Sequence, residues 1–527
     1  MNKNVILFKG RSYQYEDEKI LLIPLSLISL ASVIREFYNP IILNGDIKSE
    51  IQIFKDVEIY LHSVLCVGIS ALTGPEIASG LRFAAMVKET CPDIPIIWGG
   101  WHVSCLPKES IKNPYVDAII VGLGQIIFPL VLDRINQGSR FDDLAGVVTI
   151  DNNNGQIKCN QPLRSFDLHD CPLPAFDMLD LEFYRRESLN FLHYPKINDV
   201  KITGYLYYVT SFGCPFSCAF CSNDLLFNQC WYGYSVDAVL DQLGWLIREY
   251  GFNSIAIIDA EFFHQIKRVE YFCDEIIKRD YKFVWDAQAS VKSILRLQKK
   301  GLLPKLRQAG CWRMNIGAET GTEEMLKYIN KKIHIKDTLE CSHALKKANI
   351  VGTFNFLFGL PPETYFDLIE SFSLAYHLKK VNPDSPLPIS FYTPFPGTPI
   401  FDDALKYGFV APKNLEEWAN YKVSYANLAN EIPWRRKEHE KLVYDVLTFY
   451  LPIAVPGNIR RGTITMYKRK IEKSPFRILF KLASMIADWR IKKMNFRFRI
   501  EKFLYDLYCG LFIRKYYKSA NWTTNDD

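Results

Sequence analysis

The stretch YLYYVTSFGCPFSCAFCSN, residues 205–223, decides the fold. Its first part, YLYYVTS (205–211), is a short apolar and aromatic run of the kind that forms a buried strand. Its second part places Cys214, Cys218 and Cys221 close together in one loop. We therefore interpret the stretch as a strand that leads directly into a metal-binding loop, and the flanking sequence indicates the kind of sheet to which that strand belongs.

A series of strand-like and helix-like segments follows the cysteine loop. Six βα units in succession indicate an incomplete TIM-type barrel over residues 201–420, with its active site at the carboxyl ends of the strands. The strands after the first are SIAIID (254–259), FVWDAQAS (283–290), RMNIGAE (313–319), TFNFLFG (353–359) and PISFYTPF (388–395). The helical segments between them are 236–250, 265–279, 292–309, 336–348 and 363–380.

Residues 1–150 show a second βα alternation. Short, nearly continuous apolar runs separated by amphipathic helices predict a doubly wound, Rossmann-like parallel sheet, which binds ligands at the carboxyl ends of its strands. The expected strands are 5–8, 40–44, 64–70, 94–100 and 117–124, and the expected helices are 24–37 and 76–91. Residues 151–200 are expected to form a linker with a hairpin turn at 151–155, and residues 421–527 a helical C-terminal region.

Composition limits the class of protein. A chain of 527 residues with 48% apolar and 23% charged residues is expected to fold into two or three globular domains. Thirteen cysteines without a secretory signal predict intracellular thiols and a cytoplasmic protein. The longest apolar run, residues 20–34, is short for a membrane span and contains Pro24.

Positive charge is concentrated near the C-terminus. Residues 460–518 hold 17 Lys and Arg against 4 Asp and Glu, a balance of +13, whereas the whole chain carries only +6. In 464–518, apolar and aromatic residues recur at roughly helical spacing between the cations. This pattern suits peripheral contact with the inner face of a membrane, and it equally suits a helical domain packed on the barrel; nucleic acid is a third partner that the charge would fit.

The cysteine spacing also limits the metal. Three thiolates can bind three irons of a 4Fe-4S cluster and leave the fourth iron open for a substrate. A structural zinc would need a fourth ligand nearby, but Cys230 lies nine residues after Cys221 and His264 is farther still.

The loop, with Phe220 before the last cysteine, resembles the signature of radical S-adenosylmethionine (SAM) enzymes. This resemblance, over about 200–420, implies that the open iron chelates the amino and carboxylate groups of SAM. One electron, from a donor such as flavodoxin or ferredoxin, then cleaves the sulfonium to methionine and a 5′-deoxyadenosyl radical. It also implies cofactor contacts at strand ends, although each of the polar residues among them could instead cap a helix. The SAM-contact candidates are Phe220, Asp259, Glu261, Gln288, Asn315 and Glu319.

The N-terminal domain resembles the cobalamin-binding class of these enzymes. The resemblance rests on GISALTG (68–74), WGGWH (98–102) and VGLG (121–124), where small residues would let the backbone approach a macrocycle. After the first strand, KGRSYQYEDE lacks the Asp-x-His-x-x-Gly motif, so a cobalamin here is expected to lack a histidine lower ligand. A domain that binds only a partner, or nothing, is the alternative. The candidate cobalamin contacts are Ser70, Thr73, Gly99, Gly100, His102, Gly122, Gly124 and Gln125.

Three functions follow from these resemblances. The first is a cobalamin-dependent C-methyltransferase that acts on an unactivated carbon of a small or lipid-like substrate. The second uses the same cofactors for radical cyclisation, rearrangement or oxidation, as in tetrapyrrole ring formation. The third, a tRNA-modifying methylthiotransferase, resembles proteins with a second three-cysteine cluster; here Cys66, Cys91 and Cys105 are scattered, which makes a nucleic-acid substrate the weaker hypothesis.

Overall fold

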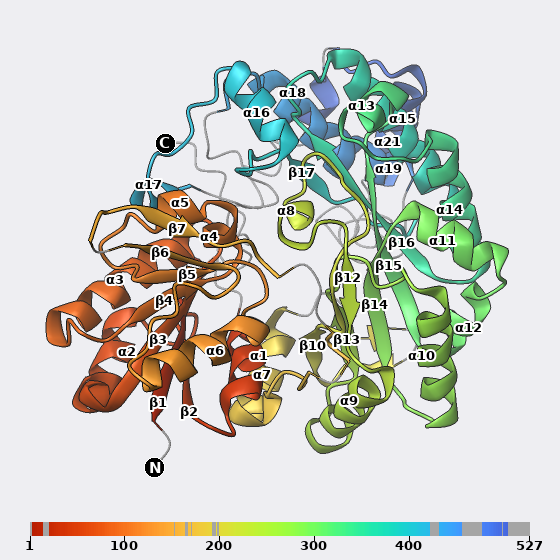
Figure 1. The fold of residues 1–527 in the computed structure, drawn as a ribbon. Coiled ribbons are helices and arrows are strands. Elements are labelled where there is room, and N and C mark those ends of the chain that lie inside the picture. Colours follow the sequence, from red (N-terminus) through yellow and green to blue (C-terminus); the bar gives the residue numbers. More distant parts are fainter. Residues whose placement is uncertain are drawn as a thin grey trace.

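The computed structural model contains two large sheets, each covered by helices, that face each other across the molecule (Figure 1). Its described residues are 3–13, 21–151, 153–163, 167–169, 171–191, 196–197, 200–421, 432–455, 477–497 and 499–503. Only the backbone is described for residues 191, 477–481 and 483.

The first sheet has seven strands in the order β2-β1-β3-β4-β5-β6-β7, and β1 to β5 are parallel. The predicted doubly wound architecture is confirmed. An antiparallel hairpin, β6 and β7, extends the sheet beyond residue 150, and Asn153 and Asn154, within the expected turn, form a turn between the two strands. The strands are β1 Asn4–Lys9, β2 Asn39–Asn44, β3 Val64–Ser70, β4 Ile96–Gly99, β5 Ala118–Ile120, β6 Val147–Ile150 and β7 Ile157–Cys159.

Strand β1 shows why the sheet must be covered on both faces. Its four central side chains, Val5 to Phe8, are all fully buried, and successive side chains of a strand point to opposite faces. Val5 and Leu7 pack with α1 and α6, whereas Ile6 and Phe8 pack with α2 and α3. These helices are α1 Leu25–Ile34, α2 Glu50–Val57, α3 Pro75–Thr90 and α6 Gly124–Asn136.

The second sheet contains six parallel strands in sequential order, β10-β13-β14-β15-β16-β17, and it curls into an open barrel (Figure 1). All six strands that the sequence predicts are present. The strands are β10 Tyr205–Tyr208, β13 Ser254–Ile257, β14 Val284–Ala289, β15 Cys311–Glu319, β16 Val351–Phe358 and β17 Ile389–Phe391. The main outer helices are α9 Val236–Tyr250, α10 Ile266–Lys278, α11 Val291–Lys299, α12 Leu303–Gln308, α14 Ile335–Lys347 and α15 Tyr365–Val381.

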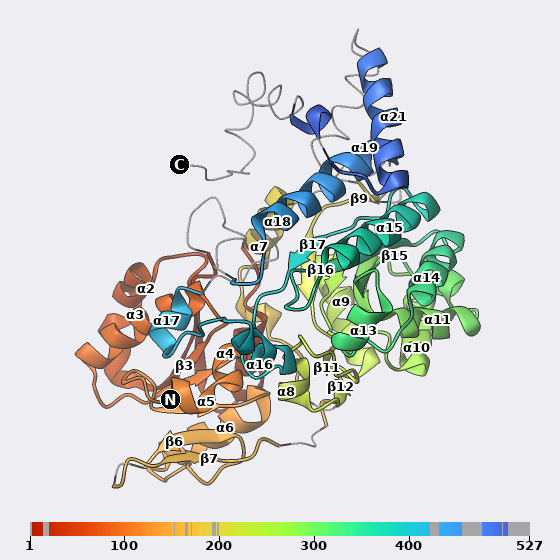
Figure 2. The same cartoon turned by 90° about the horizontal axis from the view of Figure 1, so that it is seen from above.

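The C-terminal region is helical where it is described, which agrees with the prediction. Most of the basic segment, 464–476 and 504–518, lies outside the described residues. Within the described chain, no helix is both long enough and apolar enough to cross a bilayer. The helices after the barrel strands are α16 Pro399–Lys406, α17 Leu415–Ala419, α18 Lys437–Tyr444, α19 Leu451–Ala454 and α21 Arg477–Lys493 (Figure 2).

Candidate active site

A two-stranded hairpin holds the base of the cysteine loop. β11 (Ser211–Gly213) and β12 (Trp231–Gly233) pair antiparallel, so the chain between them, which carries all three cysteines and α8 (Asn223–Phe227), projects as one closed loop. Gly213 has φ +82°, and a Cβ there would collide with the carbonyl oxygen of Cys230. Glycine is therefore required at the point where the strand turns into the loop.

Asp259 fixes the start of the same loop. Its Oδ1 accepts a hydrogen bond of 2.6 Å from the Thr210 backbone N–H, and its Oδ2 accepts bonds of 2.5 Å from the hydroxyls of Thr210 and Ser211. Burial raises the pKa of Asp259, while these hydrogen bonds act in the opposite direction. Both oxygens are thus occupied by the protein, so Asp259 is placed as a positioning residue for the loop.

Residues 329–331, which follow the fourth barrel strand and a short helix, hold the middle of the loop. The Ala219 N–H donates to the carbonyl oxygen of Ile329 at 2.9 Å. The Asn330 amide donates to the backbone oxygen of Ser217 at 2.7 Å and to its hydroxyl at 3.0 Å. A segment more than a hundred positions away in sequence therefore fixes the backbone between the cysteines.

The three thiols lie in one electrostatic environment with a buried ion pair. Burial raises the pKa of Cys214 to about 12 and also raises the pKa values of Cys218 and Cys221. The ammonium of Lys331, 2.7 Å from a Glu319 carboxylate oxygen, counteracts this effect at Cys218 and Cys221. Such a cation stabilises the thiolate form that metal binding needs.

No three His, Cys, Asp or Glu side chains in the described chain are arranged to hold a single metal ion. The case for the cluster therefore depends on the donor set itself: three cysteines on one loop, held by hydrogen bonds on both sides and partly exposed. These residues fit an iron–sulfur cluster in number and chemistry.

The remaining candidate SAM contacts lie in different surroundings. Glu261 is buried four residues after the end of β13, and its Oε1 has no hydrogen-bond partner among the described residues. Asn315 donates to Asp286 at 2.9 Å inside the barrel and lies in register with Gln288. Glu319 has φ +66°, and its carboxylate forms an ion pair with Lys331. Phe220 packs against the main hydrophobic core.

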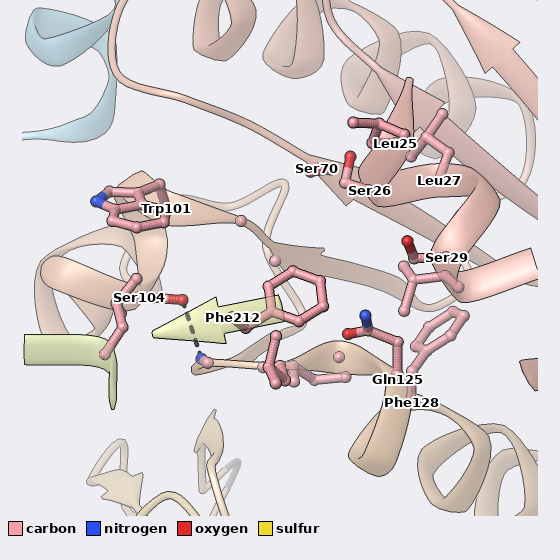
Figure 3. A pocket seen from close by; sticks show the side chains of 18 of the residues that line it. Leu25, Ser26, Leu27, Ser29, Ser70, Trp101, Ser104, Gln125, Phe128 and Phe212 are labelled. Atoms are coloured by element: carbon pink, nitrogen blue, oxygen red, sulfur yellow. Dashed lines mark hydrogen bonds between the residues drawn. The ribbon is translucent and has the colours of Figure 1, made fainter. Parts of the chain in front are cut away.

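A cavity of about 480 Å³ lies between the two sheets and touches the root of the cysteine loop. On one side it is lined by the carboxyl ends of β3, β4 and β5 and by the start of α1. On the other side it is lined by Ser211, Phe212 and Gly213, immediately before Cys214 (Figure 3). The cavity therefore joins the ligand-binding edge of the first sheet to the candidate cluster loop.

Most of the candidate cobalamin residues line this cavity. Gly100, at φ +95°, could not carry a Cβ without meeting the backbone of Ala71 at 2.8 Å, so the chain here is packed as tightly as glycine allows. Gly122 has φ +87°, and a Cβ there would meet no atom within 4 Å because the residue faces open space. Small residues thus form a wall that suits a large flat ligand. The lining candidates are Ser70, Gly99, Gly100, Gly122, Gly124 and Gln125.

Thr73 and His102 do not line the cavity. They contact each other, with 2.9 Å between Thr73 Oγ1 and His102 Nδ1, and the imidazole ring lies 5.4 Å from the ring of Trp418. Burial lowers the pKa of His102 to about 4, which keeps the ring neutral. The described residues that line the cavity include no histidine.

Sequence reasoning missed the link between the cavity and the cysteine loop. α4 (Trp101–Cys105) begins at the cavity wall, and the Trp101 indole N–H donates to the Ser222 hydroxyl at 2.5 Å, next to Cys221. Trp101, Phe212, Asn330 and Lys331 carry no local signature in the sequence, because their placement depends on contacts between distant segments.

Residues 208–375 match the family model described as the radical SAM superfamily. This part of the chain is a radical SAM domain. An uncharacterised methyltransferase of Pyrococcus horikoshii is 27% identical over 403 residues, which are 76% of this chain and 81% of that protein. An anaerobic magnesium-protoporphyrin IX monomethyl ester cyclase of Rubrivivax gelatinosus is 29% identical, over 66% of this chain and 61% of its own length.

Two solved structures share the two-sheet fold. The radical SAM methyltransferase TsrM of Kitasatospora setae, with cobalamin and a [4Fe-4S] cluster bound, has a TM-score of 0.63 at 15% identity, over 92% of this chain and all of that chain. The cobalamin-dependent radical enzyme OxsB, with aqua-cobalamin and SAM bound, has a TM-score of 0.61 at 20% identity, over 71% of this chain and 52% of that chain. The predicted family and fold are confirmed, and the chain is a radical SAM enzyme.

Proposed function

We propose that this radical SAM enzyme is a cobalamin-dependent C-methyltransferase. One observation carries the proposal: a single cavity is lined both by the glycine-rich ends of β3 to β5 and by the residues that lead into the cysteine loop. A corrinoid bound there would lie next to the loop that binds the cluster. The two solved structures with this fold, which contain cobalamin together with SAM or a [4Fe-4S] cluster, support the same proposal.

Several residues around the cysteine loop would have distinct roles. Cys214, Cys218 and Cys221 would ligate three irons as thiolates, and Lys331 would offset their negative charge. When bound, the cluster supplies the electron that cleaves SAM, and the corrinoid supplies a methyl carrier. Asp259 and Asn330 act through the loop backbone, holding the thiolates in place without touching the reacting atoms.

Glu261 is the residue best suited to accept the SAM amino group. It lies near enough to Cys214 and Lys331 to share their electrostatic environment, and its Oε1 has no partner in the described chain. A buried carboxylate oxygen without a donor is costly, and an ammonium would satisfy it. Asp259 is an equal candidate for SAM contact in the sequence, but both of its carboxylate oxygens already accept hydrogen bonds from the protein.

The cavity wall would exclude water and orient the substrate. Phe212, Phe227 and Trp101 bring apolar surface between the two sheets, and Trp101 ties this wall to Ser222. Excluding water protects a carbon radical from side reactions. We propose a small or lipid-like substrate and a flavodoxin or ferredoxin as electron donor, in the cytoplasm.

Anaerobic turnover with reductant, cobalamin and SAM labelled with deuterium in its methyl group tests the proposal. We expect 5′-deoxyadenosine together with labelled methyl on the corrinoid, measured by mass spectrometry. Deoxyadenosine without labelled corrinoid would exclude methyl transfer while leaving the radical chemistry intact. Replacing all three cysteines by alanine is the matched control and should abolish both products.

A second candidate function is radical ring formation with the same two cofactors. Its support is the similarity to the Rubrivivax gelatinosus cyclase, of which this chain spans less than two thirds. In that case SAM cleavage would persist and no labelled methyl would reach the corrinoid or a product. The same experiment therefore separates the two functions.

A further inference from the structure

One face of helix α21 (Arg477–Lys493) packs against the rest of the protein. Ala487 and Ile491 are buried, and the Ser484 hydroxyl donates to the carbonyl oxygen of Ile453 at 3.1 Å. Asp488 accepts from the hydroxyl of Tyr376 at 3.3 Å. This face docks the helix on α19 and α15 at the edge of the barrel (Figure 2).

The opposite face of α21 is apolar and exposed. Leu482, Met485, Ile486 and Trp489 fall at positions i, i+3, i+4 and i+7, so they share one stripe. Their exposed fractions are 49%, 65%, 42% and 51%. A helix on the surface of a globular protein ordinarily presents polar side chains to water, so a contiguous apolar stripe marks an interaction surface.

Cations flank this stripe. Lys493 and Arg497, just beyond Trp489, are exposed, and 17 Lys and Arg stand against 4 acidic residues over 460–518, within a chain whose remainder is acidic. We propose that the outer face of α21 docks this enzyme on an anionic lipid surface. The helix lies parallel to that surface and inserts Leu482, Met485, Ile486 and Trp489, while the exposed Lys493 and Arg497 hold headgroup phosphates.

Two features favour a lipid surface over the other basic-patch ligand, nucleic acid. Binding to the phosphates of nucleic acid needs cations but gives the apolar side chains no contact, whereas a helix in a membrane interface uses its cations and its apolar side chains. Tryptophan is also suited to the headgroup level, because its ring is apolar while its indole N–H stays hydrated. The inference is independent of the proposed function, since none of the described side chains of α21 lines the cavity.

Vesicle flotation of the full chain tests this inference. We compare phosphatidylcholine vesicles with and without phosphatidylglycerol, at low and high salt. Wild type is expected to float with the anionic vesicles and to be released by salt. The double variant M485E/W489E is expected to reduce binding at least about tenfold, because it replaces inserted apolar surface with charge near anionic headgroups.

A matched control adds the same two charges elsewhere. I59E/V410E alters two apolar side chains that are 86% and 80% exposed, outside α21, and should float like wild type. Circular dichroism and melting temperature confirm that both variants fold. Equal flotation of wild type and M485E/W489E, or no flotation of wild type, would overturn the inference. A lipid-independent dimer that M485E/W489E dissociates would overturn it too, by showing that a second copy covers this face.

Discussion

Asp259 and Glu261 are two buried carboxylates, two residues apart, that follow the same barrel strand. Asp259 accepts three hydrogen bonds from Thr210 and Ser211, whereas Glu261 keeps Oε1 without a partner among the described residues. Burial raises the pKa of Glu261 to about 7, against the hydrogen bonds from neighbouring serines. The first carboxylate is arranged to shape the cysteine loop, and the second is arranged to receive a cation.

The substitution Asp259→Asn is expected to weaken the loop. The amide keeps one acceptor oxygen but turns an NH₂ group toward hydroxyls that donate in the wild type, which costs about 1–3 kcal/mol in a buried site. We expect a lower urea midpoint and reduced iron content after anaerobic reconstitution. Asp286→Asn, a buried carboxylate of the next strand, is the control and should retain iron. Equal iron content in D259N and wild type would contradict the positioning role.

The substitution Glu261→Gln is expected to leave the cluster intact and to weaken SAM binding. Loss of a charge-assisted hydrogen bond of about 1.5–3 kcal/mol raises the dissociation constant roughly 10- to 100-fold. Because the wild-type pKa is about 7, the carboxylate is protonated below that pH. The affinity of the wild type for SAM should therefore fall as the pH drops through 7, whereas the affinity of E261Q should not change with pH. Anaerobic calorimetry measures both. A parallel pH profile in both proteins would argue against this contact.

At this scale the sequence predicts the ligands but not their supports. The cysteines are recognisable because their spacing within one loop is a local pattern. Lys331 and Asn330 reach the same loop from beyond the fourth barrel strand, and Trp101 reaches it from the other sheet. No local pattern in the sequence indicates such contacts.

At the scale of elements, the turn after β16 contains a carboxylate that folding leaves under-satisfied. In FGLPPET (358–364), Glu363 Oε2 accepts from the Gly359 N–H at 2.6 Å, and Oε1 is buried without a hydrogen-bond partner in the described chain. Burial raises the pKa of Glu363 to about 8. The folded state thus holds this proton more tightly than the unfolded chain does.

The wild type should lose stability as the pH rises from about 5 to 8. Over this window the unfolded Glu363 is ionised while the folded one keeps its proton, so the free energy of unfolding falls with pH. The neutral isostere Glu363→Gln keeps the acceptor for Gly359 and removes the titration. We expect E363Q to be more stable by about 1–3 kcal/mol at pH 8 and nearly unchanged at pH 5, by urea unfolding. Identical pH profiles would refute the assignment.

Local pattern predicts most elements, and the misses have physical causes. Strands buried on both faces, such as β3 at Val64–Ser70, are recognisable because nearly every residue is apolar. The hairpin of β11 and β12 escapes notice because its strands are three residues each and are defined by pairing alone. The expected helix over 292–309 is divided into α11 and α12, with Gly301 at φ +70° between them.

At the scale of the molecule, the chain crosses back to hold its two sheets together. α17, which follows the barrel, packs on α3 of the first sheet. The Trp418 indole N–H donates to Glu109 at 2.8 Å, and Asn113 donates to Glu416 at 2.6 Å. Trp418 is almost fully buried against His102, so this histidine, a cobalamin candidate in the sequence, supports the junction beside the cavity.

Removing this indole should loosen the junction and, with it, the cavity that both sheets line. Trp418→Ala deletes a buried ring, at a cost of about 3–5 kcal/mol, and leaves Glu109 without its donor. We expect a larger radius of gyration in solution scattering and weaker cobalamin binding measured by absorbance. Trp418→Phe keeps most of the ring and loses only the hydrogen bond, so it should lie between W418A and wild type. If W418A bound cobalamin as tightly as wild type, cobalamin binding would not depend on the contact between α17 and the first sheet. The glycine-rich strand ends of the first sheet would then suffice to hold the corrinoid.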